Sequence, residues 1–496
     1  MTAPIDIEFV AKDEVDLASA AGIIVAVCAG AEGFGPGAEA VDAAMSGGLR
    51  RAVSGTEWKG EAGAVMRIPA PAGLDADLLL LVSLGEGDDP ADARKAGGAL
   101  AAALAGKTGR KPSTVLAADV APETVAEIAF GLALRAYGFD VYKTGEDDRL
   151  APAPVTFAVD APEKVSRASR ANMAVAEGVF FARDLVNEPA NVLGTEEFAA
   201  RLAAMGELGL EVEILEEDDL RALGMGALLG VGMGSESPTK VVVMQWKGGG
   251  DEPPLALVGK GVVFDTGGIS LKPAGGMEEM TMDMGGAGLV AGVMRGLALR
   301  GARANVVGLV GLVENMPDGR AQRPGDIVKS MKGDTIEVIN TDAEGRLLLA
   351  DVLWYAQDRF KPSAMMDFAT LTGAIIVALG HETAGYFSNS DEFCAEFAAA
   401  AEATGEAAWR MPMGPGYDKQ IKSRLADMKN VGGGRAGGSI TAAQFLKRFV
   451  KDETPWIHVD IAGVALRSEA LDLSPRGATG WGVRAVDALV RGRETR

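Results

Sequence analysis

The sequence contains only two cysteines and two histidines in 496 residues. Cys28 and Cys394 cannot form a disulfide framework in a chain this long, which favours a reducing compartment and, by default, the cytoplasm. Of the two histidines, His381 precedes Glu382, but position 385 is glycine, so the zinc helix H-E-x-x-H is absent. A bound metal would therefore be held mainly by oxygen, with room for an amine ligand.

Long apolar runs and an excess of positive charge are also missing. The longest uncharged stretch, Leu17–Ala31, has 15 residues, fewer than the roughly 20 that a membrane-spanning helix needs. Acidic residues precede it, where a secretory signal would carry positive charge. Lys and Arg number 48 against 69 Asp and Glu, which gives a net charge of −21. We therefore expect neither a nucleic-acid nor a membrane partner.

The composition is that of a globular protein with more than one domain. Hydrophobic residues make up 48% and charged residues 24% of the chain, close to the average for soluble proteins. Strand-like and helix-like patterns alternate along both halves, which favours an α/β fold with a largely parallel sheet. In the first part the pattern predicts strands at Gly22–Ala29, Leu78–Leu84 and Val155–Val159, and a helix within Pro122–Tyr137. A domain boundary is expected near 160, followed by a long helix over 163–186.

The second part continues the alternation, with strands predicted near 210–215, 239–246, 255–259, 304–313 and 363–369. Glycines gather at the ends of these runs, among them Gly267 and Gly268. In layered α/β domains, ligands bind at the loops that follow the carboxyl ends of the strands. A functional site is therefore expected in this second part.

Three segments combine charged residues with glycines at such positions: 258–268, 282–286 and 340–346. Lys260 follows an apolar run, and its alternative interpretation is a surface lysine. Asp342 and Glu344 are two residues apart, so in extended chain both carboxylates would point the same way. The alternative is that Asp342 caps a helix over Leu347–Phe360, with Glu344 in its first turn.

Together these blocks resemble one family closely. VGKGVVFDTGGISLKP (258–273), MDMGG (282–286) and NTDAEGR (340–346) are similar to the leucyl aminopeptidase family of cytosolic metallopeptidases. The resemblance spans about 183–480. It implies a smaller N-terminal α/β domain similar to macro domains (1–160), a linking helix (161–190) and a larger α/β/α catalytic domain around a mixed, largely parallel sheet (191–496).

The resemblance also implies a pair of divalent metal ions in each subunit, Mn²⁺ or Zn²⁺. Asp265 and Glu344 would bridge the two ions, Asp342 would bind the first ion, and Lys260 and Asp283 would bind the second. Four carboxylates then balance two divalent ions, provided that Lys260 binds as a neutral amine. Two such ions can share a water molecule and lower its pKa, so that no histidine base is required.

Outside the metals, the resemblance implies a catalytic pair, Lys272 and Arg346, with bicarbonate as an anion bound at Arg346. The side-chain pocket of the substrate would be lined by Met280, Thr370, Gly373 and Ala462, for which ordinary core packing is the alternative. The expected activity is release of N-terminal leucine or other apolar residues from peptides by a cytoplasmic homohexamer.

Two other functions stay open at this point. A dipeptidase of the same family, of the cysteinylglycine type, would share all of these residues, and comparing a dipeptide with a longer peptide would separate the two activities. A binding or scaffold protein with a vestigial peptidase domain would not need all seven polar residues. Metal-dependent turnover of a leucine anilide would distinguish such a protein from an enzyme.

Overall fold

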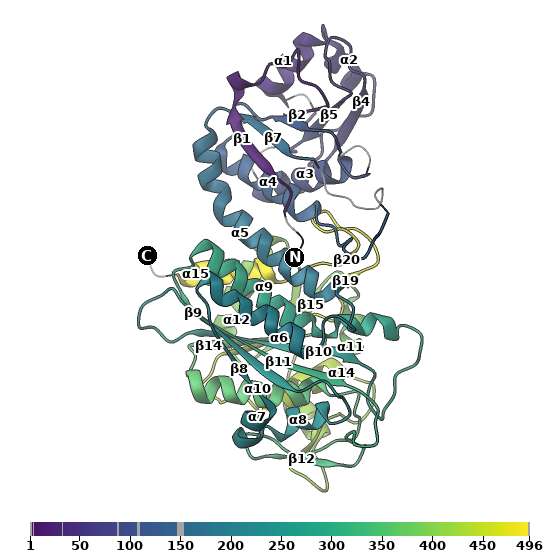
Figure 1. Cartoon of the computed structure of the whole chain (residues 1–496), viewed down its shortest axis with the longest axis vertical. Helices are drawn as coiled ribbons and strands as arrows, with labels where there is room; N and C mark the ends of the chain where they lie inside the picture. Colours follow the sequence, from purple (N-terminus) through teal and green to yellow (C-terminus); the bar gives the residue numbers. More distant parts are fainter. Residues whose placement is uncertain are drawn as a thin grey trace. The chain divides into compact units, whose positions relative to one another are not determined.

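The computed structural model describes residues 2, 4–31, 33–86, 89–106, 110–145 and 153–494. The chain forms two compact units (Figure 1): unit 1 comprises Met1–Phe180 with Glu469–Arg476, and unit 2 comprises Phe181–Ser468 with Gly477–Arg496. The division falls inside helix α5 (Pro162–Asn187). Within the described ranges, no helix has the length and apolar character needed to cross a membrane.

Unit 1 is built on a seven-stranded sheet with the order β1-β7-β6-β2-β5-β4, and β3 pairs with β2. Its strands are parallel except β3 and β4, which run antiparallel to their neighbours. The strands are β1 (Ile7–Ala11), β2 (Ile23–Ala29), β3 (Gly33–Phe34), β4 (Val65–Pro69), β5 (Leu78–Ser83), β6 (Ser113–Leu116) and β7 (Val155–Val159).

Helices cover both faces of this sheet because its central strand β2 has apolar side chains on both faces. In β2, Ile23 and Val25 belong to a cluster with Leu100 of α3, whereas Ile24 packs in a second cluster with Val41 of α1. Side chains alternate between the two faces of a strand, so a fully apolar strand feeds two cores. The helices are α1 (Pro36–Ala44), α2 (Gly48–Ser54), α3 (Pro90–Ala103) and α4 (Pro122–Arg135).

Unit 2 contains an eight-stranded sheet with the order β16-β15-β18-β14-β10-β11-β9-β8. The four central strands, β18, β14, β10 and β11, are parallel, while β9, β8 and β15 join in antiparallel pairs. The strands are β8 (Glu211–Leu215), β9 (Lys240–Lys247), β10 (Leu255–Asp265), β11 (Asn305–Asn315), β14 (Ala364–Ala369), β15 (Ala384–Ser388), β16 (Ala408–Arg410) and β18 (Trp456–Asp460).

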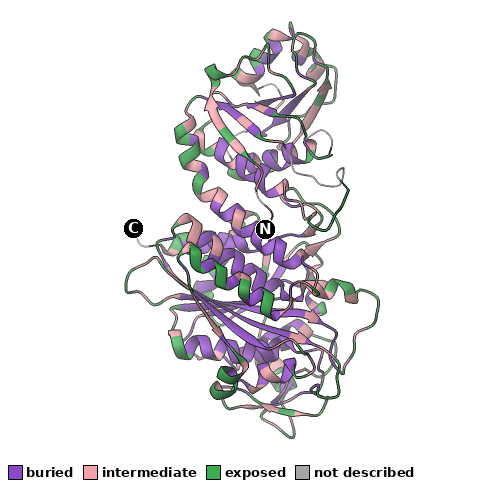
Figure 2. Cartoon of the chain, in the orientation of Figure 1, coloured by how far each residue is buried: buried purple, intermediate pink, exposed green. Residues whose placement is uncertain are grey.

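Helix α9 packs on one face of this sheet and contacts α15, while α10 and α8 pack on the other face (Figure 1). Figure 2 shows that buried residues concentrate in the sheet of each unit and in the inner faces of its helices. The larger helices are α6 (Thr195–Ala203), α7 (Glu217–Leu223), α8 (Gly226–Gly232), α9 (Gly285–Arg300), α10 (Gly345–Phe360), α11 (Gly373–Leu379), α12 (Asp391–Thr404), α14 (Gly438–Lys447) and α15 (Val483–Arg493). Smaller elements include β12 (Ile327–Lys329), β13 (Thr335–Glu337), β17 (Met428–Lys429), β19 (Leu466–Arg467), β20 (Gly477–Ala478) and α13 (Pro415–Asp418).

This architecture confirms the predicted α/β fold class with a mixed, largely parallel sheet. One strand differs from its prediction, because β10 continues past 259 and ends at Asp265. Its glycines suggested a strand end, but they serve close packing instead. A Cβ at Gly259 would lie 2.7 Å from the carbonyl oxygen of Gly286, and a Cβ at Gly261 would lie 2.4 Å from that of Gly311.

Candidate metal centre

Lys260 and Asp265 both lie in β10, between β11 and β14 at the centre of the sheet. They are five residues apart, so in a regular strand their side chains would point to opposite faces. Between Val262 and Asp265, however, three steps along β10 match only two steps along β11. The extra residue is a β-bulge, which turns Asp265 toward the same side as Lys260.

Lys260 is buried, with 2% of its surface exposed, so the alternative of a surface lysine is wrong. Its Nζ donates to Asp283 Oδ1 at 2.7 Å and to the carbonyl oxygen of Thr370 at 2.9 Å. It also lies 2.9 Å from Glu344 Oε1. A Cβ at Gly345 would be 2.5 Å from Lys260 Cε, so the glycine of the 340–346 segment makes room for this side chain.

Asp283 comes from a short 3₁₀ helix, η5 (Met277–Met284), that leads into α9. The start of α9 approaches the backbone of the sheet closely, because a Cβ at Gly286 would lie 1.9 Å from the carbonyl oxygen of Phe368. This close approach places Asp283 beside Lys260. Thr370 Oγ1 donates to Asp283 Oδ1 at 2.8 Å and so fixes one carboxylate oxygen.

Asp342 and Glu344 lie on the segment that connects β13 to α10. Asp342 is in a turn rather than in extended chain, since β13 ends at Glu337. Glu344 occupies the N-cap position of α10, and no side-chain hydrogen bond caps this helix. The helix-cap alternative for the two acids is therefore wrong, and both carboxylates are available for another role.

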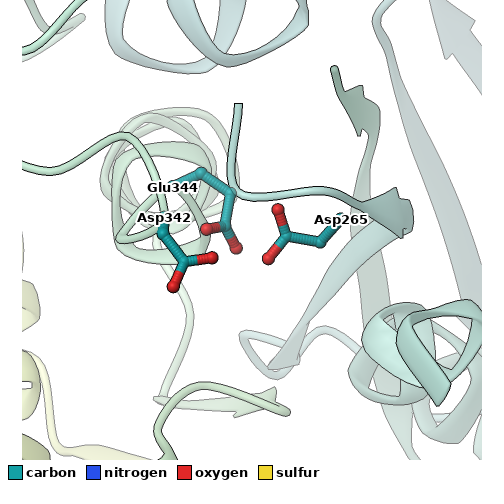
Figure 3. A group of neighbouring side chains, drawn as sticks. All are labelled: Asp265, Asp342 and Glu344. Carbon is teal, nitrogen blue, oxygen red and sulfur yellow. The ribbon is translucent and has the colours of Figure 1, made fainter. Parts of the chain in front are cut away.

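Asp265, Asp342 and Glu344 converge on one point, as Figure 3 shows. One carboxylate oxygen from each lies within 4.8 Å of the others. Asp265 and Glu344 are buried, and Asp342 is partly exposed. Three carboxylates at this spacing repel one another unless positive charge lies between or beside them.

The loop after Asp265 returns Lys272 to this cluster. Gly267 and Gly268 adopt φ values of +87° and +64°, which glycine reaches without strain. The backbone N–H of Lys272 donates to the carbonyl oxygen of Thr266 at 2.9 Å and closes the loop. Lys272 Nζ then lies 2.6 Å from Asp265 Oδ2 and also forms an ion pair with Asp342.

The four carboxylates carry more negative charge than the two lysines neutralise. Burial raises the pKa of Asp283 and of Glu344 above the ordinary carboxyl range. Burial alone would lower the pKa of Lys260, but the charges of Asp283 and Glu344 outweigh it and raise this pKa. The carboxyl groups of Asp283 and Glu344 and the amine of Lys260 all favour their protonated forms. The cluster therefore favours additional positive charge.

Two buried oxygen atoms of the cluster support a metal site directly. Asp283 Oδ2 and Glu344 Oε2 have no hydrogen-bond partner among the described residues. An unsatisfied buried carboxylate oxygen is costly, whereas the same oxygen is a good ligand for a divalent cation. The oxygen-rich donor set, with one lysine nitrogen, therefore fits the ligand set that the sequence predicts for divalent ions.

Arg346 follows Glu344 into α10 and is 7% exposed, so it is not a surface residue. Its Nη1 donates to the carbonyl oxygen of Asn430 at 2.8 Å, while its Nε has no partner in the described part of the chain. Burial lowers the pKa of Arg346 to about 10, so the guanidinium stays charged at neutral pH. A charged group with an unused donor at this place is suited to holding an anion.

A cavity of about 1130 Å³ opens onto these residues. Its lining includes all seven predicted metal and catalytic residues and all four predicted pocket residues: Lys260, Asp265, Asp283, Asp342, Glu344, Lys272, Arg346, Met280, Thr370, Gly373 and Ala462. Thr370 is not simply a packing residue, because its hydroxyl holds Asp283. The cavity is also lined by apolar side chains such as Ile376 and Val377.

Sequence reasoning missed Asn315 and Arg435. Asn315, at the end of β11, donates to Asp265 Oδ1 at 2.7 Å. The available signal was a polar residue that ends a buried strand beside β10. Arg435 lines the cavity from a segment at 432–438 that is rich in glycine, and this glycine content is the signal that could have indicated it.

Comparisons with known proteins give a consistent result. The family model described as the cytosol aminopeptidase family, catalytic domain, matches residues 180–486, and the model of the N-terminal domain of the same family matches residues 24–146. A probable cytosol aminopeptidase of Cereibacter sphaeroides is 62% identical over 493 residues, covering 99% of each chain. That of Dinoroseobacter shibae is 62% identical over 494 residues, again with 99% of each chain covered.

Two solved structures extend these similarities to the fold. A mutant of tomato leucine aminopeptidase superimposes with a TM-score of 0.86 at 32% identity, covering 99% of each chain. The bottromycin maturation enzyme BotP in complex with Mn superimposes with a TM-score of 0.83 at 33% identity, covering 96% of this chain and all of the other.

Proposed function

The chain belongs to the cytosol aminopeptidase family and is a peptidase, and on this premise we propose that it uses two divalent ions to release N-terminal residues from peptides. The preferred residues are leucine and other apolar ones. Family membership confirms the resemblance drawn from the sequence. The observation that carries the metal proposal is a pair of buried carboxylate oxygens, on Asp283 and Glu344, that have no hydrogen-bond partner among the residues the structure describes.

In this proposal Asp265 and Glu344 would contribute to both metal positions. Asp342 would contribute to the first position, and Lys260 and Asp283 to the second. Lys260 would bind as a neutral amine, which requires that the ion displace the proton held by the surrounding carboxylates. Mn²⁺ and Zn²⁺ both suit oxygen ligands with one nitrogen, and the Mn in the BotP complex favours Mn²⁺ as the first ion to test.

When bound, such a pair of ions supplies a nucleophile at neutral pH by lowering the pKa of water, and it polarises the scissile carbonyl. The residues of the chain do the remaining work. Lys272 lies at the edge of the cluster, 2.6 Å from Asp265 Oδ2. Its compact ammonium can turn toward a carbonyl oxygen as negative charge develops there, and can stabilise that charge in the transition state.

Arg346 holds an anion in the same proposal. Its guanidinium is anchored through Nη1 to the carbonyl oxygen of Asn430, and its Nε lacks a partner in the described ranges. A planar anion such as bicarbonate would fit the bidentate fork of a guanidinium. Held by Arg346 at that place, such an anion would supply a general base for the reaction.

The substrate side chain would occupy the part of the cavity lined by Met280, Thr370, Gly373 and Ala462. Gly373 leaves open space, since no atom of the described part of the chain lies within 4 Å of a Cβ built there. An apolar side chain gains about 25 cal/mol for each Å² that it buries in such a pocket. The dipeptidase alternative uses the same residues, so it differs only in the length of peptide accepted.

We further propose a cytoplasmic homohexamer, which rests on the family resemblance. Light scattering coupled to size-exclusion chromatography tests this state, because a hexamer of 51.1 kDa chains is far heavier than a monomer.

The central experiment is a metal titration of the chelator-treated protein with leucine p-nitroanilide as substrate. Activity should be absent without metal and should return with Mn²⁺ or Zn²⁺, at two ions per chain by elemental analysis. Fewer than one ion in each fully active chain would contradict the two-ion model. Rates on leucylglycine and on a leucine-headed pentapeptide separate the two activities, since a dipeptidase would cleave only the first.

A further inference from the structure

Asn315 is the last residue of β11 and lies directly opposite Asp265 in the ladder between β10 and β11. It is 4% exposed, so its polar side chain must find partners inside the protein. None of the roles proposed above uses it. Its side-chain amide lies beside the bulge in β10.

The amide of Asn315 joins two separate ligand-bearing segments. Its Nδ2 donates to Asp265 Oδ1 at 2.7 Å and to the carbonyl oxygen of Thr341 at 3.1 Å. Thr341 directly precedes Asp342. One amide group therefore connects the carboxylate at the end of β10 to the turn that carries Asp342 and Glu344.

The backbone of Asn315 strengthens the same junction. Its carbonyl oxygen accepts hydrogen bonds from both the N–H and the hydroxyl of Thr266, at 3.0 and 2.8 Å. Thr341 in turn donates from Oγ1 to the carbonyl oxygen of Gly267 at 2.6 Å. The loop after Asp265 and the turn before Asp342 are thus held to each other through the end of β11.

These bonds also determine which oxygen of Asp265 is available. Oδ1 accepts from Asn315 Nδ2 and from the backbone N–H of Gly267 at 2.8 Å. Oδ2 receives neither bond and lies 2.6 Å from Lys272 Nζ. Asn315 therefore occupies one oxygen and leaves the other for the cluster.

We propose that Asn315 is a positioning residue for the metal centre: it sets the orientation of Asp265 and the distance between Asp265 and the Asp342–Glu344 turn. This inference rests on the proposed function only for the metal site itself. Partners that orient metal ligands are often worth about 10–100-fold in metal affinity or activity. We expect an effect of this size from Asn315.

The strand that carries Asn315 also supplies a matched control. Asn305 is the first residue of β11, about 30 Å away at 3.3 Å per residue. Its Nδ2 likewise donates to two acceptors, the carbonyl oxygens of Gly250 at 2.8 Å and Glu252 at 3.0 Å. Asn305→Ala therefore removes the same number of donated bonds from the same strand without touching the cluster.

The test is a titration of the metal-free, full-length protein with Mn²⁺, followed by isothermal calorimetry. Asn315→Ala should weaken Mn²⁺ binding by about 10–100-fold, and Asn305→Ala should leave it unchanged. Activity lost in Asn315→Ala should return when Mn²⁺ is raised in proportion, with KM for the substrate unaltered. Unchanged affinity in Asn315→Ala, or equal weakening in Asn305→Ala, would overturn the proposal.

A second variant keeps the test decisive if alanine prevents folding. Asn315→Asp preserves the shape of the side chain but replaces both donated bonds with a carboxylate that faces Asp265. Positioning predicts weaker Mn²⁺ binding. If only the local charge mattered, the added negative charge would tighten binding, and that result would overturn the proposal. These affinities do not depend on turnover, so an inactive parent protein would refute the proposed function and leave this comparison intact.

Discussion

The central strands of the two units bury very different side chains. β2 (Ile23–Ala29) is apolar throughout, and its alternate residues feed two hydrophobic clusters. β10 (Leu255–Asp265) buries Lys260 and Asp265, each only 2% exposed. Taking a charged group out of water costs several kcal/mol unless partners compensate for it. β10 thus gives up stability that β2 retains.

This difference indicates that β2 contributes mainly to the stability of unit 1, whereas β10 carries the charged residues of the candidate site in unit 2. β10 is parallel to β11 and β14, β2 is parallel to β5 and β6, and both strands lie under helices on both faces. In β10, however, the lysines of the cluster do not neutralise its carboxylates, and two carboxylate oxygens lack partners among the described residues. Such an arrangement is favourable only with cations bound. Substitutions of the charged residues near β10 should therefore alter activity, whereas substitutions of the apolar residues in β2 should alter stability.

The largest effect is expected from Glu344→Gln. A neutral amide cannot be shared by two cations, and weakening each ion by about 10–100-fold would lower activity at limiting metal by about 10²–10⁴. The metal-free variant should melt no lower than the metal-free parent, because one crowded charge is gone. Assays of kcat/KM and calorimetric melting curves measure the two properties.

Glu402→Gln, at an exposed position of α12, is the matched control and should change neither quantity. If Glu344→Gln kept its activity but melted several degrees lower, the carboxylate would be a structural element like the residues of β2. The comparison between the strands would then fail.

Lys272→Ala should lower kcat by about 10²–10³, the usual effect of removing one group that stabilises a developing oxyanion. Its metal content, measured by elemental analysis, should stay that of the parent. Arg346→Ala should lower kcat less, since water or free bicarbonate can replace the bound anion. Near-normal kcat in both variants, with metals in place, would show that this division of roles is wrong.

For Lys260, we expect Lys260→Arg to be nearly as damaging as Lys260→Ala, with activity about 10–100-fold lower in both. Guanidinium stays protonated, so it would place a positive charge beside the ion where an amine should bind. Lys247→Arg, at an exposed ion pair with Glu211 on the same sheet, is the control and should be neutral. Full activity in Lys260→Arg would leave Lys260 with no role as a ligand.

That the site residues lie together could be predicted, because their types and spacing indicate shared chemistry. The backbone geometry that brings them together could not be predicted. The bulge before Asp265 depends on the register between β10 and β11, whose paired residues are about 50 positions apart in the sequence. The contact of Asn315 with Asp265 could not be predicted for the same reason, since it depends on the pairing of β11 with β10.

Larger-scale organisation was also only partly predictable. The alternation of apolar runs indicated both sheets, because period-two and period-3.6 patterns depend on residues close in sequence. The grouping of Glu469–Arg476 with unit 1 depends on contacts made late in the chain. A Cβ at Gly98, for example, would lie 2.2 Å from the carbonyl oxygen of Asp472. No pattern of neighbouring residues predicts this contact between Gly98 and Asp472.

The smallest effect on activity is expected from Ile24→Ala in β2. Ile24 is fully buried between apolar neighbours, so its truncation leaves a cavity and should lower the free energy of unfolding by about 2–5 kcal/mol. At a temperature where the variant stays folded, its kcat, KM and Mn²⁺ affinity should equal those of the parent. Chemical denaturation measures the first quantity, and steady-state kinetics with calorimetry measure the others. A variant that is folded yet loses metal affinity would show that β2 supports the metal centre and that the two strands are not separate in function.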